Sequence, residues 1–313
     1  MIKILIVARY KEKGFAPFVT EQVSALERAG VECCYFPVRS KGIAGYLRHL
    51  TSLRKAIEEF RPDVVHAHYG LCGLLANLQR RVPVVTTYHG SDINDPKVRR
   101  LSKIAIRLSR YNIFVSQKNL DLAKPRRNYA LIPCGINLED YPIMDKSRAR
   151  EQMGLKPDRK YVLFAGAFDN AVKNAPLAKA AVGSLVDAEL LELKGYSREQ
   201  VAALMQAADA FLMTSFSEGS PQVIKEAMAC GCPIVSVDVG DVRERIGGLD
   251  GCFVAQTKSP EDLAGLLKDA LEFNGKTAGR ARIIDDNLDN RQLVLKLTSL
   301  YKKLSEKSTK EHD

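Results

Sequence analysis

Residues 210–237, AFLMTSFSEGSPQVIKEAMACGCPIVSV, contain a strand–helix–strand pattern from which the fold can be predicted. Ala210–Thr214 is a short apolar run, which predicts a strand that is buried on both faces. Ser220 suits a helix N-cap and Pro221 the first helical position, so a helix is predicted over 221–230. Pro233–Val237 is a second apolar strand. A strand, a helix and a strand in this order predict a right-handed crossover within a parallel sheet.

The same alternation continues on both sides of this unit in the second half of the chain. Strands are predicted at 161–165, 189–193 and 252–255, and helices at 175–185, 198–208, 241–246, 260–273 and 288–304. The last helix precedes a charged tail. These elements predict a second domain over 151–287, and a segment, 288–313, that packs back toward the first domain.

The first half of the chain, residues 1–150, has the same rhythm. Strands are predicted at 2–8, 31–36, 63–67, 83–88, 112–116 and 129–133, and helices at 18–29, 43–60, 71–80 and 97–110. The stretch 135–158 is expected to be irregular. The chain is therefore predicted to be an α/β protein with two Rossmann-like domains, whose parallel sheets face each other across a cleft.

Length and composition agree with two globular domains. The chain has 313 residues, of which 46% are hydrophobic and 27% charged, and a domain has about 150 residues. The apolar runs are much shorter than the roughly 20 residues that span a bilayer, and no signal peptide is evident. The seven cysteines form no metal or disulfide framework. A cytoplasmic protein with reduced thiols is expected.

The net charge of +10 is unevenly distributed. Residues 1–150 contain 26 Lys and Arg against 13 Asp and Glu, whereas residues 151–313 contain 21 against 24, so the halves carry +13 and −3. This asymmetry indicates an anionic partner for the first half, or simply a well-solvated surface.

Six basic residues between Lys97 and Arg110 alternate with apolar ones, which is typical of an amphipathic helix at an anionic membrane surface. The alternative is a helix that covers the sheet and exposes a cationic face. Nucleic acid is not expected as a partner, because no aromatic stacking pattern accompanies the basic residues.

Several motifs are absent from the sequence. There is no G-x-G-x-x-G, which disfavours a dinucleotide-dependent oxidoreductase. There is no Asp-x-Asp pair that could hold a metal against a diphosphate. His66 and His68 share a strand face, and a pair of core histidines is favoured over a metal site.

The loop that precedes the 221–230 helix has the features of an anion site. The positive end of the helix and its N–H groups would point into this loop, and Gly219 would let a ligand approach the backbone. Glu218 and Glu226 flank the loop and suit sugar hydroxyls better than phosphate. The alternative is that Glu218 only complements the helix dipole and Glu226 lies on an exposed helix surface.

These residues resemble the signature of the family 4 retaining glycosyltransferases (glycosyl transferases group 1), which have the GT-B fold. The resemblance covers nearly the whole chain. It rests on Glu218 and Glu226 eight positions apart with Gly219 and Pro221 between them, on the run from Glu226 to Val235, and on Gly195, Gly14, 89–92, 133–137 and 239–244.

The resemblance implies roles for individual residues. Glu218, His89 and Lys173 would be catalytic, with Glu218 and His89 near the donor sugar and Lys173 on the diphosphate. Glu226 would accept the ribose hydroxyls. The other donor-binding residues would be Gly219, Ser220, Pro221, Gly14, Gly166 and Gly195. No metal and no cofactor would be needed, because the nucleotide sugar is a substrate.

The basic residues expected at the diphosphate depart from the family pattern. Ala167 stands where the family usually has an arginine, and Lys173 is displaced by about one residue. The loss of a charge-assisted contact of roughly 1.5–3 kcal/mol would weaken the stabilisation of the diphosphate. Lys225, or a cation of the first domain, is the candidate replacement.

The function implied by the resemblance is transfer of a sugar from a nucleoside-diphosphate sugar to a glycan or lipid-linked acceptor. The second domain would bind the donor and the basic first domain the acceptor, with a role in cell-surface polysaccharide synthesis at the inner face of the membrane. Two alternatives stay open: an epimerase or phosphorylase of the same fold, and a non-catalytic carbohydrate-binding or partner subunit.

Overall fold

The chain divides into two compact units. The computed structural model describes residues 1–12, 14–40 and 42–310. Unit 1 comprises the described residues of 1–135 and 290–310, and unit 2 comprises 136–289. The division falls at Ile136 rather than after residue 150, because Ile136 is buried in the core of unit 2 and its N–H donates to the carbonyl of Leu288.

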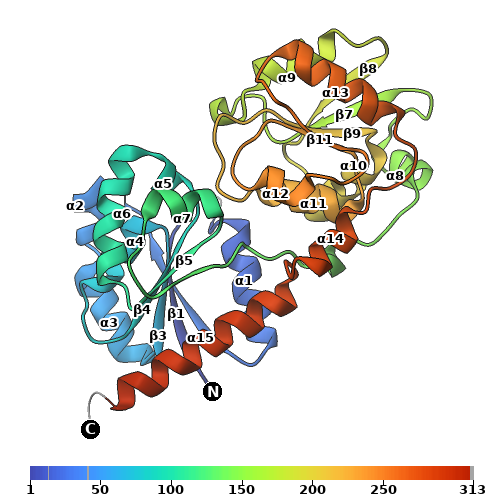
Figure 1. Ribbon diagram of the computed structural model, residues 1–313. Helices are drawn as coiled ribbons and strands as arrows, with labels where there is room; N and C mark the ends of the chain where they lie inside the picture. The colour runs from blue at the N-terminus through green and yellow to red at the C-terminus, as the bar shows by residue number, and fades with distance from the viewer. Residues whose placement is uncertain (13, 41, 311–313) are drawn as a thin grey trace. The chain divides into compact units, whose positions relative to one another are not determined.

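Unit 1 is a six-stranded parallel sheet with helices on both faces (Figure 1). The strand order is β2-β1-β3-β4-β5-β6. Its elements are β1 (Lys3–Arg9), α1 (Pro17–Arg28), β2 (Glu32–Val38), α2 (Gly42–Leu47), α3 (Leu50–Phe60), β3 (Val64–His68), α4 (Gly70–Asn77), β4 (Val84–Tyr88), α5 (Ser91–Asn94), α6 (Pro96–Leu108), β5 (Tyr111–Phe114), α7 (Gln117–Ala123), β6 (Tyr129–Leu131) and α15 (Asn290–Lys310).

The central strand β1 separates two cores because alternate side chains of a strand point to opposite faces. Ile4 and Ile6 pack in one core with residues of α1 and α15. Leu5 and Val7 pack in the other core with residues of α3 and α4. The continuous apolar run of β1 thus reflects burial on both sides, as expected for a parallel sheet.

The helix predicted over 43–60 is divided into α2 and α3, so that prediction is wrong at its centre. The N–H of His49 donates to the carbonyl of Tyr46, three residues back, which closes a tight turn between the helices. The His49 ring lies 3.2 Å from the Ser40 hydroxyl, measured from Nε2 to Oγ. The apolar spacing continues across the turn, which is why the periodicity did not reveal it.

Unit 2 is a five-stranded parallel sheet in the order β11-β10-β9-β7-β8. The structure confirms the eleven predicted strands of the two sheets, each with bounds within two residues. The elements are η1 (Leu138–Asp140), α8 (Lys146–Met153), β7 (Lys160–Phe164), η2 (Ala171–Lys173), α9 (Ala175–Gly183), β8 (Ala188–Glu192), α10 (Arg198–Ala207), β9 (Ala210–Met213), α11 (Gln222–Cys230), β10 (Ile234–Ser236), α12 (Val242–Ile246), β11 (Cys252–Val254), α13 (Pro260–Glu272) and α14 (Gly279–Asp285).

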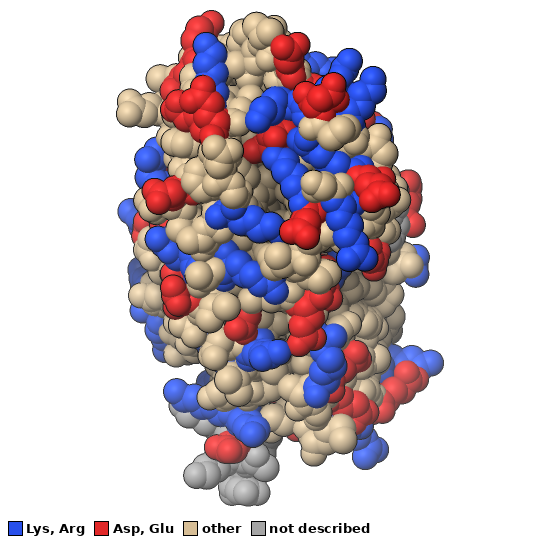
Figure 2. Space-filling model, turned by 90° about the vertical axis from the view of Figure 1, so that its right-hand side faces the viewer, with Lys and Arg blue, Asp and Glu red and all other residues tan. Residues whose placement is uncertain are grey.

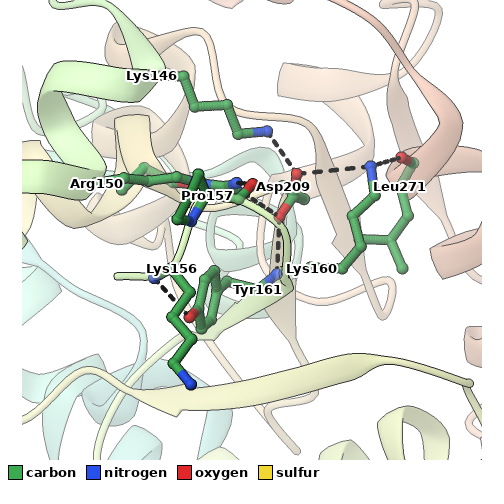
Figure 3. Close-up of polar contacts among 9 residues, drawn as sticks. Lys146, Arg150, Lys156, Pro157, Lys160, Tyr161, Asp209 and Leu271 are labelled. Atoms are coloured by element: carbon green, nitrogen blue, oxygen red, sulfur yellow. Dashed lines mark hydrogen bonds and ion pairs between the residues drawn. The ribbon is translucent and has the colours of Figure 1, made fainter. Parts of the chain in front are cut away.

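The stretch 135–158, expected to be irregular, contains the helix α8. A buried carboxylate holds this helix against the sheet (Figure 3). Asp209 accepts hydrogen bonds from the Arg150 guanidinium at 2.7 Å, from Lys146 Nζ at 2.6 Å and from the N–H of Tyr161 at 2.7 Å. The Asp209 side chain is 5% exposed. The helix is therefore anchored by charge rather than by an apolar stripe.

Replacing Asp209 by alanine is expected to lower the free energy of unfolding by about 3–5 kcal/mol, because Arg150 would remain buried without its counter-ion. Chemical denaturation of the full chain measures the change. The control is Asp269→Ala, since Asp269 is exposed on α13. A loss for Asp209→Ala no larger than that of the control would contradict the anchoring role.

Within the described ranges, no helix combines the length and the apolar character that are needed to cross a membrane.

Candidate functional site

The sheet of unit 2 has its topological switch point between β7 and β9, because the chain leaves β7 for β8 on one side and returns to β9 on the other. Ligands of open α/β sheets bind beyond the carboxyl ends of the strands at such a point. Lys173 lies in η2 after β7, and Glu218 lies in the loop after β9. Their Nζ and Oε1 atoms are 2.7 Å apart, and each side chain is 18% exposed.

The loops that carry this ion pair are fastened to each other. The Thr214 hydroxyl donates to the carbonyl of Lys173 at 2.9 Å, and the N–H of Phe216 donates to the carbonyl of Val172 at 2.9 Å. The Lys173 side chain lies over Gly166, where an added Cβ would come within 3.1 Å of its Cγ. Three predicted site residues, Gly166, Lys173 and Glu218, are therefore brought together, and the sequence did not indicate the ion pair.

The loop from Gly219 to Pro221 packs against the turn at Gly240. Gly240 has a φ of +62°, and a Cβ there would lie 2.6 Å from the carbonyl oxygen of Gly219. The Ser220 hydroxyl donates to Asp241 Oδ2 at 2.8 Å, an oxygen that also accepts from Arg245 Nε at 2.9 Å. These contacts fix the backbone at the start of α11.

The prediction that Ser220 caps α11 is wrong by one residue. The helix begins at Gln222 with Pro221 at the N-cap position, and no side chain in the described ranges caps it. Ser220 bonds to Asp241 instead, because the neighbouring Gly240 turn brings that carboxylate within reach. The positive end of the α11 dipole still points toward the loop that holds Glu218.

The other predicted donor-binding residues of unit 2 lie on α11 and after β8. Glu226 is half-buried in the second turn of α11. Lys225, the candidate substitute for the missing arginine, is fully buried, and its Nζ donates to Gln222 Oε1 at 2.9 Å. Gly195 has a φ of +82° in the turn between β8 and α10.

Two predicted residues, His89 and Gly14, belong to unit 1. His89 follows β4 and is the outermost of three stacked imidazoles, with ring centroids 4.6 Å apart for His66 and His68 and 5.2 Å apart for His68 and His89. His66 and His68 share a strand face as predicted, and His89 joins them from the adjacent strand. Gly14 has a φ of +102° in a tight turn that is closed by two hydrogen bonds with Lys11.

Hydrogen bonds define the proton arrangement of this histidine row. His66 lies 2.6 Å from the Tyr301 hydroxyl through Nδ1 and 2.7 Å from Thr87 Oγ1 through Nε2. His68 Nδ1 lies 3.0 Å from His89 Nε2, whereas the buried Nε2 of His68 has no hydrogen-bond partner among the residues that the structure describes. A buried N–H without an acceptor is disfavoured, so the proton of neutral His68 belongs on Nδ1. His68 then donates to His89 and fixes its ring.

Burial governs the ionisation of this region. It lowers the pKa of His68 to about 3, and burial together with the neighbouring His68 lowers the pKa of His66 well below its usual value. Burial also raises the pKa of Asp92 to about 6, although the N–H groups of Gly70, His89 and Gly90 donate to its carboxylate.

His68 is expected to make the chain sensitive to acid. Because its folded pKa lies below the unfolded value of about 6.5, its contribution to stability is complete above pH 6.5 and is lost as the pH falls toward 3. Between pH 7.5 and pH 5 the loss is about 2 kcal/mol. Urea unfolding of the wild type and of His68→Gln at both pH values measures this contribution as the difference between their pH dependences, because Asp92, whose pKa is raised, acts in the opposite direction in both proteins. An unchanged difference between the two pH values in this variant would contradict the assignment.

In the part of the chain that the structure describes, no group of three or more His, Cys, Asp or Glu side chains is arranged to hold a metal ion. The three histidines stack face to face instead of converging on one point.

Known proteins resemble this chain in both halves. The model of Glycosyltransferase Family 4 matches residues 13–140, and the model of Glycosyl transferases group 1 matches residues 162–272. TuaC of Bacillus subtilis, provisionally named a teichuronic acid biosynthesis glycosyltransferase, is 27% identical over 59% of this chain. The match spans only 56% of the length of TuaC.

Solved structures resemble the chain over nearly its whole length. The match to sucrose-phosphate synthase of Thermosynechococcus elongatus covers 97% of this chain and 99% of the synthase chain. The sequence identity is 17% and the TM-score is 0.82. The match to HepE of Anabaena, determined in complex with UDP and glucose, covers 96% of this chain and 100% of the HepE chain. The sequence identity is 19% and the TM-score is 0.74. These likenesses confirm the predicted GT-B class of two parallel-sheet α/β domains.

Proposed function

Because the chain belongs to the family 4 (group 1) glycosyltransferases, we propose that it transfers a sugar from a nucleoside-diphosphate sugar to a hydroxyl group of an acceptor. One observation carries the proposal. The Lys173–Glu218 ion pair joins the loops of β7 and β9 at the switch point of unit 2, and the uncapped N-terminus of α11 follows directly.

The donor is held by unit 2 in this proposal. Glu226 accepts hydrogen bonds from the ribose hydroxyls, while the N–H groups at the start of α11 and Lys173 face the diphosphate. Gly219, Ser220 and Pro221 form the turn along which the ligand lies, and Gly166 and Gly195 leave room for it. The solved complex of HepE with UDP and glucose supports a nucleotide-sugar ligand for this fold.

The chemical difficulty is the separation of a sugar cation from a departing diphosphate. Fixed positive charge at the leaving group lowers that barrier, and Lys173 and the α11 dipole supply it. We propose that no metal is needed for this role and that the anomeric configuration is retained, with the leaving phosphate accepting the proton of the attacking hydroxyl. Glu218 and His89 are assigned to the neighbourhood of the donor sugar.

The acceptor is assigned to unit 1 and is proposed to be a glycan or a lipid-linked sugar of a cell-surface polysaccharide. The name of TuaC, which refers to teichuronic acid biosynthesis, supports such a pathway. Release of nucleoside diphosphate from a panel of activated sugars, with and without acceptors, tests the reaction. Acceptor-dependent release is expected; an unchanged donor after prolonged incubation would contradict it.

Ala167 favours a second candidate, a non-catalytic subunit that binds the donor without turning it over. Ala167 directly follows Gly166 beside the ion pair, at the position of the usual arginine. Thermal stabilisation by a nucleoside diphosphate without release of that nucleotide from any donor would favour this candidate. An epimerase or phosphorylase of the same fold would process the sugar without a new acceptor.

An anionic membrane is the proposed docking surface of unit 1, which would place the protein at the cytoplasmic face of the membrane. Lys103 and Arg107 on α6 are exposed beside Ile104 and Leu108, which are 43% and 40% exposed. A hollow of about 760 Å³ between α6 and α7 is lined by six cations and, among the described residues, by no carboxylate. On the face drawn in Figure 2, by contrast, acidic and basic side chains are interspersed.

Vesicle binding tests this surface. The chain is expected to sediment with vesicles that contain anionic lipid and to be released by salt, because each basic residue near such a surface contributes about 1 kcal/mol. Arg107→Gln with Lys103→Gln should weaken binding about tenfold or more, and Lys268→Gln on α13 serves as the control. Equal binding to neutral vesicles would contradict the proposal.

A further inference from the structure

Unit 1 has its own switch point, between β1 and β3, because the chain leaves β1 for β2 on one side and returns to β3 on the other. A cavity of about 480 Å³ opens at this point. It is lined by residues at or just after the carboxyl ends of β1, β3 and β4, including Arg9, Lys11, Tyr69 and Asp92, and by Tyr46 of α2. The position corresponds, within its own sheet, to that of the Lys173–Glu218 pair in unit 2.

The charged groups of this cavity favour an anion. Arg9 and Lys11 line it, and among the described residues neither forms an ion pair. The carboxylate that also lines it, Asp92, is buried and accepts hydrogen bonds from three backbone N–H groups. Asp92 is therefore committed to the backbone, whereas the two cations are available to a ligand.

Two tyrosines, Tyr46 and Tyr69, also line the cavity. Tyr69 has a φ of +74° and a ψ of 149°, a backbone conformation that residues other than glycine rarely adopt. Such a strained conformation is kept only where the surrounding structure fixes it. Its N–H donates to the carbonyl of Thr87 at 2.8 Å. Burial raises the pKa of Tyr46 to about 12 and that of Tyr69 above its usual range, so both phenols keep their protons at neutral pH.

Two residues that line the cavity, Tyr69 and Asp92, contact the predicted catalytic histidine, His89. The Tyr69 and His89 rings have centroids 4.9 Å apart, and Asp92 Oδ1 accepts from the N–H of His89 at 3.0 Å. The cavity is therefore linked to His89 through the Tyr69 ring and the Asp92 carboxylate. The volume suits a ring or two rather than an extended polymer.

We propose that this cavity is the acceptor site and that it selects a hydroxylated acceptor with a carboxylate or phosphate group, which Arg9 and Lys11 bind. The inference rests on the proposed glycosyl transfer. It adds that the acceptor carries a negative charge and names the residues that bind the charged group. Hydrogen bonds between a cation and an anion are stronger than those between neutral groups. The anionic group is therefore expected to account for most of the difference in affinity between acceptors.

Binding of matched charged and neutral probes to the full chain tests the inference. The probes are glucuronate against glucose, and inositol 1-phosphate against inositol. Calorimetric titration should give at least about tenfold tighter binding for one charged probe than for its neutral partner. Preference in the first pair identifies a carboxylate as the recognised group, and preference in the second pair identifies a phosphate.

Variants assign the preference to the cavity. Arg9→Gln and Lys11→Gln should each weaken binding of the charged probe about tenfold and leave the neutral probe unchanged. Arg9→Lys should retain part of the preference, and Arg28→Gln, at the exposed end of α1, should retain all of it. Equal binding of charged and neutral probes, or unchanged binding in both glutamine variants, would overturn the inference.

The same preparations separate this inference from the proposed function. Titration with nucleoside diphosphates reports on unit 2 independently of the acceptor cavity. If a nucleoside diphosphate binds and the probes show no charge preference, the acceptor assignment fails and the glycosyltransferase proposal stands. If no nucleoside diphosphate binds, the proposed function fails and the role of the cavity as an acceptor site fails with it.

Discussion

Replacing Glu226 by alanine is expected to weaken binding of the nucleotide-sugar donor by about a hundredfold or more, with a much smaller effect on turnover at saturation. The reason is that two ribose hydroxyls would each lose a hydrogen bond to a carboxylate, at roughly 1.5–3 kcal/mol apiece. Glu226 lies on α11, whose Ile224, Ala227 and Met228 are buried in the core of unit 2, so the helix itself should remain in place.

The measurement is the donor KM together with the Kd of the corresponding nucleoside diphosphate. Glu272→Ala provides the matched control, because Glu272 is exposed at the end of α13 in the same unit. Glu226→Gln should fall between the wild type and the alanine variant, since the amide still accepts one hydrogen bond. A Glu226→Ala variant with the wild-type donor affinity would remove Glu226 from the donor site.

Replacing Lys173 by alanine is expected to lower kcat about 10²- to 10³-fold while donor affinity changes less. A group that stabilises charge as it develops on the leaving diphosphate acts mainly in the transition state. The structure adds a condition to this expectation. Lys173 is paired with Glu218 at 2.7 Å in the free chain, so the diphosphate must share the lysine with that carboxylate or displace it.

Glu218→Gln distinguishes the two roles of Lys173. This variant breaks the ion pair and keeps the lysine for the diphosphate. If Lys173 only positions Glu218, both substitutions should lower kcat equally, and the double variant should be no worse than either. If Lys173 acts on the phosphate, the loss of kcat in Lys173→Ala should vary with the pKa of the leaving group. The loss of kcat in Glu218→Gln should not vary with it. Lys268→Ala, exposed on α13, controls for the loss of a positive charge.

The strand pattern of both sheets could be predicted from sequence because parallel strands covered on both faces are continuous apolar runs. Ile4–Ala8 and Ala210–Met213 are fully buried in such runs. The helix α8 could not be predicted, since its buried residues are Ala149 and Arg150 rather than an apolar stripe. Its packing depends on Asp209, which lies 59 positions away from Arg150 in the chain.

The candidate site was predictable as a set of residues and not as a set of contacts. Glu218, Gly219 and Glu226 are found by their spacing and by their position after a strand. The pairing of Lys173 with Glu218 spans 45 positions, and it follows from the order of β7 and β9 in the sheet, which local periodicity does not encode. The bond from Ser220 to Asp241 arises in the same way, from the approach of the Gly240 turn.

A crystal structure of the chain with a bound nucleoside diphosphate tests the proposed donor site of unit 2 directly. Density for the two phosphates is expected between Lys173 and the first turn of α11, with the ribose hydroxyls within hydrogen-bond distance of the Glu226 carboxylate. A nucleotide bound elsewhere on unit 2, or phosphates that contact neither Lys173 nor the N–H groups of α11, would show that these residues do not form the donor site.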